Sequence, residues 1–457
     1  MRTTLMPLLV LMTLSAAAAG DTYTEQHKLT APDGAADDYF SSLATDGTTV
    51  VVGAFGHDAN GDESGAAYLY DVATGSLITK LLPADIETDD NFGFSVAMGS
   101  GYIAIGAPEY DLDPLVGIQS GVVYLFDSAT GTQVTKIMPD DAMSGQFFGW
   151  SVAIHQDLLV VGAPFDDVIG PFMPSGSAYI FEIPSGDQVA KLTPTDGTLL
   201  DDFGAEVAVH APWVIVGAPR DADDNGTNSG SAYIFDTAIG IQFAKLVPSD
   251  GAEFDGFGRS MAINQDVIAI GASGHDDGAD NGGVVYMYDT ATLPFPAPPS
   301  KVYPDDITEG HRFGNVALTD DLLLVGTSWD SEMGTEAGAA YLFDLATGTQ
   351  ITKLTAQDAD PEDYFGGSVS IANDTIAVGA SGDDNSVADS GSAYLFAMTA
   401  ACAFADVNAD GVLNVDDVEA FVIAFLASDP AADCDANGLF NVDDIECFVA
   451  SFLAGCP

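Results

Sequence analysis

The sequence predicts an all-β fold, a seven-bladed β-propeller closed by its own N-terminal strand, followed by a small α-helical domain. Two observations predict this organisation. Between residues 20 and 399 one unit recurs seven times with a period of 53–56 residues, and such repeats override the domain count that length alone suggests. Residues 402–457 instead carry two copies of a twelve-residue loop, each followed by apolar residues at helical spacing.

The first 19 residues have the composition of a secretory signal peptide. Arg2 supplies a basic start, Leu5 to Leu14 is an apolar run, and Ala17 and Ala19 form an A-x-A cleavage pattern. The apolar run is much shorter than the roughly 20 residues that a membrane-spanning helix needs. We therefore expect a secreted protein, extracellular or associated with a cell surface, that has no membrane span.

The charge of the chain excludes one class of partner. The sequence has 69 acidic and 11 basic residues, a formal net charge of −58 at pH 7. The negative electrostatic field of such a chain repels nucleic acid. A hydrophobic content of 47% argues against disorder.

Three anchors recur in register in every unit. A phenylalanine, followed by glycine in six of the seven units, precedes an apolar run that ends in Gly-Ala or Gly-Thr. An aromatic strand centred on a tyrosine follows 15–18 residues later. The anchors are Phe40, Phe92, Phe148, Phe203, Phe257, Phe313 and Phe365; Gly53, Gly106, Gly162, Gly217, Gly271, Gly326 and Gly379; and Tyr68, Tyr124, Tyr179, Tyr233, Tyr286, Tyr341 and Tyr394.

Each unit is predicted to form four strands, a to d. Strand a starts at the Phe-Gly, strand b is the continuous apolar run, strand c is the alternating aromatic segment, and strand d follows an Ala-Thr-Gly turn. The seventh unit ends after strand c at Phe396, whereas the N-terminal strand around Lys28 has no partner. We expect this strand to complete the last blade, which leaves no open edge between first and last blades.

The Phe-Gly and Gly-Ala-Pro units resemble FG-GAP repeats, which build the propeller of integrin α chains and of many secreted bacterial proteins. The resemblance spans about residues 21–399 and implies the propeller fold. Integrin-type repeats often carry a D-x-D-x-D-G calcium loop between strands a and b. Here these loops are short, as before Leu158 and Val267, so the integrin calcium sites are not carried over.

The b–c loops and d–a connections are predicted to share one face of the propeller, and most acidic clusters fall in them. One interpretation is a site for divalent cations or for a cationic or metal-bridged ligand; the other is a solvated acidic rim. The clusters are Asp58 to Asp62, Asp221 to Asn225, Asp276-Asp277, Asp383 to Asn385, Asp89-Asp90, Asp140-Asp141 and Asp201-Asp202.

All seven lysines lie at the same place in strand d. Because a functional basic site would not recur once per blade, we interpret them as structural, protecting an outer edge and neutralising a carboxylate of the d–a connection. The lysines are Lys28, Lys80, Lys136, Lys191, Lys245, Lys301 and Lys353.

No catalytic constellation is recognisable, so we expect a protein that is not an enzyme. The sequence has no G-x-S-x-G or H-E-x-x-H motif, and no two of its many carboxylates stand out as a glycosidase pair. His57 and His275 occupy matching loop positions, which we interpret as chance rather than as a metal site.

The two C-terminal loops have the pattern of a calcium site. Side-chain oxygens stand at positions 1, 3, 5, 9 and 12, glycine at position 6 allows the turn, and position 7 offers its carbonyl. The predicted ligands are Asp406, Asn408, Asp410, Val412, Asn414 and Asp417 in the first loop, and Asp433, Asp435, Asn437, Leu439, Asn441 and Asp444 in the second. The apolar residues of helical spacing include Val418, Phe421, Phe425, Phe448 and Phe452.

Aspartate at position 12, the tandem duplication and the lack of an entering helix distinguish the module from an EF-hand and resemble a type I dockerin. That resemblance implies two bound calcium ions and docking to a cohesin-like partner. Positions 10 and 11, where dockerins read their partner, hold Val415-Asp416 and Val442-Asp443 in place of Ser-Thr.

The four cysteines, Cys402, Cys434, Cys447 and Cys456, all belong to this module and predict two disulfides with three possible connectivities. A Cys402–Cys456 bond would join the ends of the module.

The sequence therefore favours a secreted, non-enzymatic binding or scaffold protein with an extracellular protein or glycan ligand. A polysaccharide-acting enzyme or accessory protein tethered through its dockerin, and a structural cell-envelope protein, are the alternatives.

Overall fold

The computed structural model describes residues 22–111, 119–168, 174–222, 225–293, 298–385, 387–399 and 415–427, with positions 432, 445, 448 and 449. The chain divides into two compact units. Tyr23–Ala397 forms one of them, and the two ends of the chain, Met1–Thr22 and Met398–Pro457, form the other. The larger unit is all-β and the smaller contains a helix.

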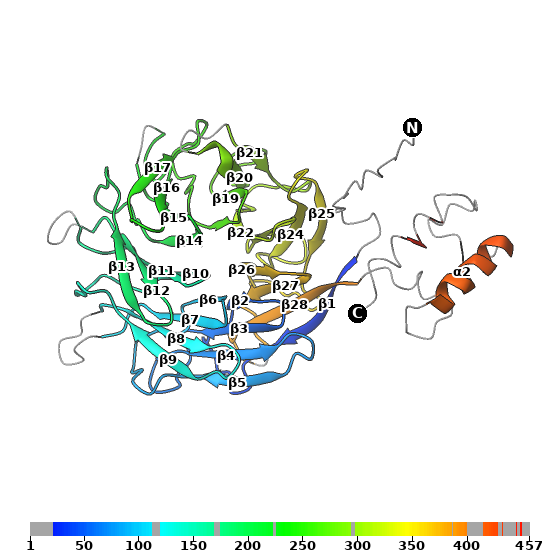
Figure 1. Cartoon of the computed structure of the whole chain (residues 1–457), viewed down its shortest axis with the longest axis horizontal. Coiled ribbons are helices and arrows are strands. Elements are labelled where there is room, and N and C mark those ends of the chain that lie inside the picture. Colours follow the sequence, from blue (N-terminus) through cyan, green and yellow to red (C-terminus); the bar gives the residue numbers. More distant parts are fainter. Residues whose placement is uncertain are drawn as a thin grey trace, which may run out of the picture. The chain divides into compact units, whose positions relative to one another are not determined.

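Seven four-stranded antiparallel sheets form the larger unit and surround a common axis (Figure 1), which confirms the predicted propeller. In each sheet the strands follow the order a, b, c, d. Strands a are β2 (Ser42–Thr45), β6 (Ser95–Gly99), β10 (Ser151–His155), β14 (Glu206–His210), β18 (Met261–Ile263), β22 (Asn315–Leu318) and β26 (Phe365–Ala372). Strands b are β3 (Thr49–Ala54), β7 (Tyr102–Ala107), β11 (Leu158–Ala163), β15 (Trp213–Ala218), β19 (Val267–Ala272), β23 (Leu322–Thr327) and β27 (Thr375–Ala380). Strands c are β4 (Ala66–Asp71), β8 (Val122–Asp127), β12 (Ser177–Glu182), β16 (Ser231–Asp236), β20 (Val284–Asp289), β24 (Ala339–Asp344) and β28 (Ser392–Thr399). Strands d are β5 (Leu77–Leu81), β9 (Gln133–Ile137), β13 (Asp187–Leu192), β17 (Gln242–Leu246), β21 (Ser300–Val302), β25 (Gln350–Leu354) and β1 (Thr22–Leu29). A 3₁₀ turn, η1 (Thr290–Thr292), follows β20.

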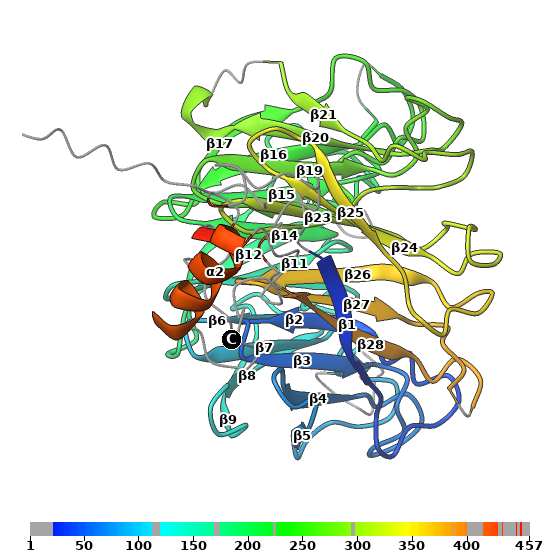
Figure 2. The same cartoon turned by 90° about the vertical axis from the view of Figure 1, so that its right-hand side faces the viewer.

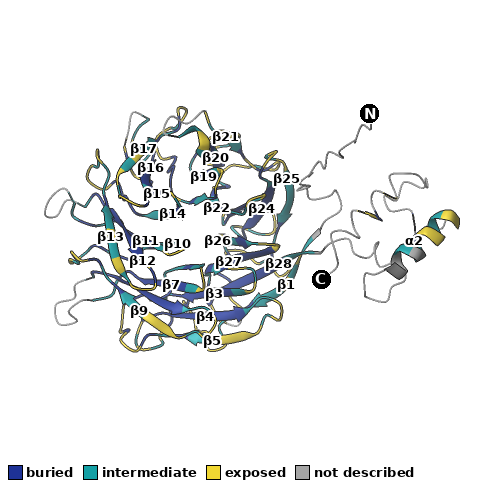
Figure 3. Ribbon diagram, viewed as in Figure 1, coloured by how far each residue is buried: buried dark blue, intermediate teal, exposed yellow. Residues whose placement is uncertain are grey.

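The hydrophobic core consists of seven clusters, one between each pair of neighbouring blades. Strands b and c are buried on both faces, whereas strands d such as β5 and β9 are partly exposed (Figure 3). In every blade the anchor phenylalanine packs edge-on against the anchor tyrosine, with ring centroids 5.3–5.8 Å apart. The anchors of the sequence are therefore the core contacts of the fold.

The N-terminal strand closes the ring, as predicted. Strand β1 pairs with β28 and supplies the fourth strand of the last blade (Figure 2). Leu29 is buried in the cluster between the last and first blades, and the ammonium group of Lys28 lies 5.2 Å from the ring of Tyr394. Strand β26 also contacts β2, so the innermost strands form a continuous circle.

The prediction that strand a starts at the Phe-Gly is wrong in six of the seven blades. Strand β6, for example, begins at Ser95, while Phe92 forms a parallel bridge with Gly65 of the preceding b–c loop. The cause is the backbone around the phenylalanine, because Asn91 and Gly93 have left-handed φ angles, +55° and +100°, outside the range of regular strands. In the last blade the same conformation at Gly366 forms an irregularity in the register of β26.

In the smaller unit, the structure describes the helix α2 (Val415–Ala427) and a few positions beyond it. The rings of Phe421 and Phe448 stack with centroids 4.0 Å apart, and Ala432 is buried beside them. The predicted signal peptide and all four cysteines lie outside the described residues. So do the first calcium loop as far as the start of α2 and the whole of the second loop, which ends at Asp444. None of the helices that the structure describes is long and apolar enough to cross a membrane.

Candidate ligand-binding site

The b–c loops and d–a connections run side by side at one end of the blades, as predicted; we call this end the loop face. The d–a connection of one blade hydrogen-bonds along the b–c loop of the blade before it. The backbone N–H of Asp89 donates to the carbonyl of Asp62, and that of Asn91 to Glu63. Because these loops hold most of the acidic clusters, the loop face is strongly negative.

A buried polar side chain, two residues before each anchor phenylalanine, shapes every d–a connection. It accepts a hydrogen bond from the backbone N–H three residues earlier, at 2.5–3.4 Å, in all seven blades. The side chains are Asp38, Asp90, Gln146, Asp201, Asp255, His311 and Asp363. This position holds the chain in the turn that leads to the phenylalanine.

The lysines of strand d pair with carboxylates of the d–a connections, as predicted. The partners are Lys28–Asp358, Lys80–Asp33, Lys136–Asp85, Lys191–Asp141, Lys245–Asp196, Lys301–Asp250 and Lys353–Asp306. Each ammonium group also lies 5.1–5.3 Å from the ring of the anchor tyrosine. The lysine thus ties strand d to the connection that enters its blade.

A second contact of the lysines explains the two matching histidines. The residue four positions after each anchor glycine is His57, Tyr110, Asp166, Asp221, His275, Asp330 or Asp383. Lys191 bonds Asp166 at 2.7 Å, and Lys80 reaches Nε2 of His57 at 2.9 Å. In the fifth blade Lys301 bonds Asp277 instead. His57 and His275 therefore share a position whose side chain contacts the strand-d lysine in six of the seven blades; in the fifth blade His275 packs against the anchor tyrosine Tyr286, with ring centroids 5.8 Å apart.

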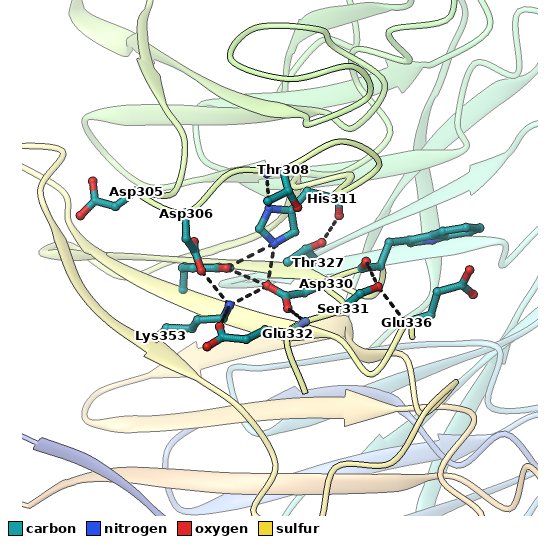
Figure 4. Close-up of polar contacts among 12 residues, drawn as sticks. Asp305, Asp306, Thr308, His311, Thr327, Asp330, Ser331, Glu332, Glu336 and Lys353 are labelled. Carbon is teal, nitrogen blue, oxygen red and sulfur yellow. Dashed lines mark hydrogen bonds and ion pairs between the residues drawn. The ribbon is translucent and has the colours of Figure 1, made fainter. Parts of the chain in front are cut away.

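The sixth blade shows the complete arrangement, which we call the blade node (Figure 4). Nε2 of the buried His311 lies 2.7 Å from Asp330, and Lys353 and the hydroxyl of Tyr341 donate to the same carboxylate. Burial alone would raise the pKa of Asp330, but the hydrogen bonds from His311 and Lys353 outweigh it and hold the pKa below its usual range. Sequence reasoning missed His311, although its place two residues before Phe313 marked it.

In the second blade the node contains a carboxyl that resists ionisation. Burial, with the neighbouring Asp111 carboxylate, raises the pKa of Asp90 to about 6. The folded state therefore binds more protons than the unfolded state between about pH 4 and 6, so this group makes the protein less stable as pH rises through that window.

We expect Asp90→Asn to remove this loss and to stabilise the protein by about 2 kcal/mol at pH 7, with little effect at pH 4. Asparagine keeps the oxygen that accepts from Glu87, and Gln146 shows that an amide fits this position. The reciprocal change, Gln146→Glu, places a buried carboxyl in a blade that has an amide at this position. It should therefore make the protein less stable as pH rises, as Asp90 does in the second blade. Chemical denaturation at both pH values measures the two effects; equal pH profiles for wild type and Asp90→Asn would contradict the prediction.

An axial cavity of about 370 Å³ lies at the centre of the ring. Its wall includes the residues that stand opposite the anchor glycines, in strand a or, for Ser260, directly before it: Ser42, Ser95, Ser151, Glu206, Ser260, Asn315 and Ser368. Several of these side chains bridge to the next blade. Ser95 donates to the carbonyl of Gly149 at 2.7 Å, Ser151 to that of Gly204 at 3.0 Å, and Ser368 to that of Ser41.

Glu206 is the exception in this ring of hydroxyl and amide groups. Burial raises the pKa of Glu206 to about 8. Among the residues that the structure describes, none donates a hydrogen bond to its carboxylate or forms an ion pair with it. Arg259, the basic residue of the lining, is exposed in the neighbouring blade. Glu206 and Arg259 are therefore the two ionisable side chains of the cavity lining.

Six half-exposed aromatic side chains of the first three blades form a continuous series that reaches the cavity wall; we call it the aromatic arc. Its ring centroids are 4.7–6.3 Å apart from neighbour to neighbour, and Phe94 and Trp150 also line the cavity. The members are Tyr39, Phe55, Phe94, Trp150, Phe147 and Phe165.

The residue directly before each anchor phenylalanine has the same left-handed backbone in all seven blades, with φ between +53° and +64°. Only one of the seven is glycine, although other residues lose roughly 1 kcal/mol in this conformation. The residues are Tyr39, Asn91, Phe147, Asp202, Gly256, Arg312 and Tyr364. One backbone conformation thus carries a glycine and six side chains of five kinds around the axis.

Of the twelve predicted calcium ligands, only Asp417 falls in a described segment, the helix α2; the other eleven lie outside the described residues. Over the described ranges of the propeller, no group of three or more His, Cys, Asp or Glu side chains is arranged to hold a metal ion.

Comparison with known families agrees with this geometry. The model of the FG-GAP repeat matches seven segments of the chain, residues 23–70, 76–126, 132–181, 187–235, 241–288, 299–343 and 349–396. Each segment runs from strand d of one blade to strand c of the next, as from β5 to β8. No curated protein matches the chain significantly.

Proposed function

The chain belongs to the FG-GAP repeat family, and on that premise we propose that it is a secreted, non-enzymatic binding or scaffold protein whose loop face recognises an extracellular protein or glycan. The observation that carries the proposal is the ring of seven residues before the anchor phenylalanines, six of which carry side chains of five kinds. A common backbone with different side chains is an arrangement suited to recognition, and backbone strain concentrates at functional positions.

The aromatic arc also supports the loop face as the binding surface. Aromatic side chains dominate the energetics of binding surfaces, because they offer a large contact area at a small entropic cost. Further apolar side chains are exposed in the same loops, including Met143, Phe254 and Trp329. Exposed residues of this kind beside acidic loops favour a ligand that combines an apolar surface with polar groups.

We expect Trp150→Ala to weaken ligand retention at least tenfold, which corresponds to the loss of about 1.4 kcal/mol or more at a binding hot spot. A matched control is available in Trp213→Ala. Trp213 packs against Phe243 with ring centroids 4.6 Å apart, as Trp150 packs against Phe94 at 4.7 Å, but it lies at the other end of its blade.

The measurement is retention of the full chain on arrays of plant and algal glycans and on the secreted proteins of the source organism. Retention that Trp150→Ala loses and Trp213→Ala keeps would support the proposal. Retention that neither variant changes would contradict it for the loop face. Turnover of a glycan would favour instead the polysaccharide-acting enzyme.

We further propose that residues 402–457 form a dockerin-like module that binds two calcium ions and attaches the propeller to a cohesin-like partner. The two loop patterns support the proposal, and so does the stacking of Phe421 on Phe448, which joins the helical segments that follow the two loops. The signal-peptide pattern of residues 1–19 supports secretion.

Removal of calcium with a chelator is expected to unfold this module, because metal binding and folding are coupled in small domains. Since the described α-helical residues, in α2 and at positions 445, 448 and 449, all lie in this module, the helical circular-dichroism signal reports on the module and the β-signal on the propeller. We expect the helical signal to fall and to return with added calcium. An unchanged helical signal in excess chelator would contradict the calcium ligation.

A further inference from the structure

The wall of the axial cavity offers mainly hydrogen-bond acceptors. A serine hydroxyl has one hydrogen to donate and two lone pairs that accept. Ser95, Ser151 and Ser368 each donate that hydrogen to a carbonyl of the next blade, so their lone pairs remain for an occupant of the cavity. An occupant that satisfies these oxygens must therefore supply hydroxyl or N–H donors.

Asn315 and Ser260 add one acceptor and one donor to the wall. The amide nitrogen of Asn315 donates to the carbonyls of Gly366 and Gly367, at 3.0 and 3.2 Å, which leaves its side-chain oxygen as an acceptor. The oxygen of Ser260 accepts from the backbone N–H of Val316 at 3.0 Å, so its own hydrogen can be donated to an occupant. Groups that both donate and accept, as hydroxyls do, match such a wall.

The two ionisable side chains of the lining favour an occupant without net charge. Burial raises the pKa of Glu206 to about 8, so at pH 7 most of this carboxyl carries a proton and both donates and accepts. A cation would find no full counter-charge there and would be repelled by Arg259. An anion would have to approach against the field of a chain with a net charge of −58. A neutral molecule rich in hydroxyl groups meets neither obstacle.

Two half-exposed aromatic rings complete the lining. Trp150 and Phe94 both line the cavity, with ring centroids 4.7 Å apart, and they continue into the aromatic arc of the loop face. A pyranose ring has faces of C–H groups that pack on an aromatic ring, and hydroxyl groups around its rim. Aromatic surface beside convergent polar groups is therefore the combination that a sugar requires.

The volume of the cavity selects a single sugar unit. The cavity of about 370 Å³ holds about twelve waters at about 30 Å³ each. A hexopyranose has about as many non-hydrogen atoms, each of which takes less space than a water, so it fits together with bridging waters. The next units of a glycan would leave the cavity along the aromatic arc.

We propose that the axial cavity binds one neutral pyranose unit at the end of a glycan. One face of the sugar packs on Trp150, and its hydroxyl groups bond to Glu206, to Arg259 and to the serine and asparagine oxygens of the ring. The inference rests on the proposed function, because it names glycan as the class of ligand and the cavity as the place that holds its terminal unit.

The experiment titrates the methyl pyranosides of glucose, galactose, mannose, xylose and N-acetylglucosamine into the full chain by calorimetry. It also follows the fluorescence of Trp150 in a Trp213→Phe/Trp329→Phe background, which isolates the signal of the cavity because the chain has three tryptophans. We expect at least one sugar to bind with a dissociation constant of about 1 mM, the range for a ligand with so few atoms. The uronic acid and the amino sugar that correspond to it should bind at least about fivefold more weakly.

The variants separate hydrogen bonding from charge. Glu206→Ser installs the residue type of other blades, so it should fold, and it should weaken sugar binding about tenfold because the longer side chain is lost. Glu206→Gln keeps a donor and an acceptor at the same reach and should stay within about threefold of the wild type. Glu182→Gln changes an exposed carboxyl outside the lining and should alter the affinity less than about twofold.

Three results would overturn the inference. One is the absence of any response of Trp150 to the sugars up to about 50 mM, far above the expected dissociation constant. Another is tighter binding of the amino sugar that Glu206→Gln abolishes, which would assign the cavity to a cation. The third is tighter binding of the uronic acid that Arg259→Gln abolishes, which would assign it to an anion.

The outcomes for the inference and for the proposed function can be told apart. Retention on the arrays that Trp150→Ala loses, but that Glu206→Ser and excess free sugar leave unchanged, would overturn the inference and support the loop face as a binding surface. A protein ligand would give this result. Binding of free sugar that Glu206→Ser weakens, with retention on the arrays unaffected by Trp150→Ala, would support the sugar site and contradict the proposed role of the aromatic arc.

Discussion

Deletion of Thr22–Leu29 is expected to abolish the cooperative unfolding transition of the propeller. These residues form β1, the outer strand of the last blade, and no other described segment can take its place beside β28. The deletion removes Leu29 from the cluster between the last and first blades and leaves Asp358 and Asp383 without the ammonium group of Lys28. Burial and the charge of Asp383 already raise the pKa of Asp363 to about 6, so the loss of this cation adds repulsion at the closing blade.

The measurement is thermal unfolding together with size-exclusion chromatography, because the exposed edge of β28 is a template for association. A synthetic peptide of residues 21–32, added in trans, should restore the transition by pairing with β28. Lys28→Met is the graded control, since it keeps the strand and should cost only about 2 kcal/mol for a half-buried ion pair. A deleted chain that melts like the wild type and stays monomeric would show that the ring does not need its closing strand.

Gly162→Ala is expected to destabilise the propeller by about 3 kcal/mol or more, as an overpacked contact between rigid backbones does. A Cβ atom on Gly162 would lie 2.0 Å from the carbonyl oxygen of Gly204, a backbone atom of the next blade. The two blades would have to move apart, and the clusters on both sides of the contact would open. The measurement is the free energy of unfolding from chemical denaturation.

Gly145→Ala is the control that separates two reasons for a glycine, the close approach of another backbone at Gly162 and a left-handed φ at Gly145. Gly145 has a left-handed φ of +79°, and an added Cβ would meet no atom within 4 Å. Its replacement should cost only the roughly 1 kcal/mol of the strained conformation. Equal losses for the two variants would mean that the spacing of the blades tolerates a methyl group at Gly162, contrary to the observed geometry.

The number of blades and the closure could be predicted because their evidence is local and repeated. Phe40, Tyr68 and their equivalents recur in register in every unit, and each of these rings is buried in a cluster between neighbouring blades. The missing strand d of the last unit and the surplus strand at the N-terminus then left a single way to complete the ring.

The axial cavity could not be predicted, because the sequence alone does not show which residues of the seven strands a line the cavity together. Ser42 stands two residues after Phe40, whereas Ser95 stands three after Phe92, yet both pair with an anchor glycine. Only the strand register aligns Glu206 with these serines. The blade node was hidden for a related reason, since His311 and Asp330 come from a d–a connection and a b–c loop that approach one another only after pairing.

The predicted calcium ligands are of a different kind, because each set lies within twelve consecutive residues. Such a pattern is readable without any tertiary structure, and it remains a prediction for both loops.

The position of β1 also sets the order in which the molecule can be assembled. Lys28 bonds Asp358, a residue 330 positions later in the chain. At ordinary rates of protein synthesis this interval lasts on the order of tens of seconds, during which the first strand has no native partner. Two newly made chains held close together in this period could exchange their first strands and form an intertwined dimer, so dilution during refolding should favour the monomer.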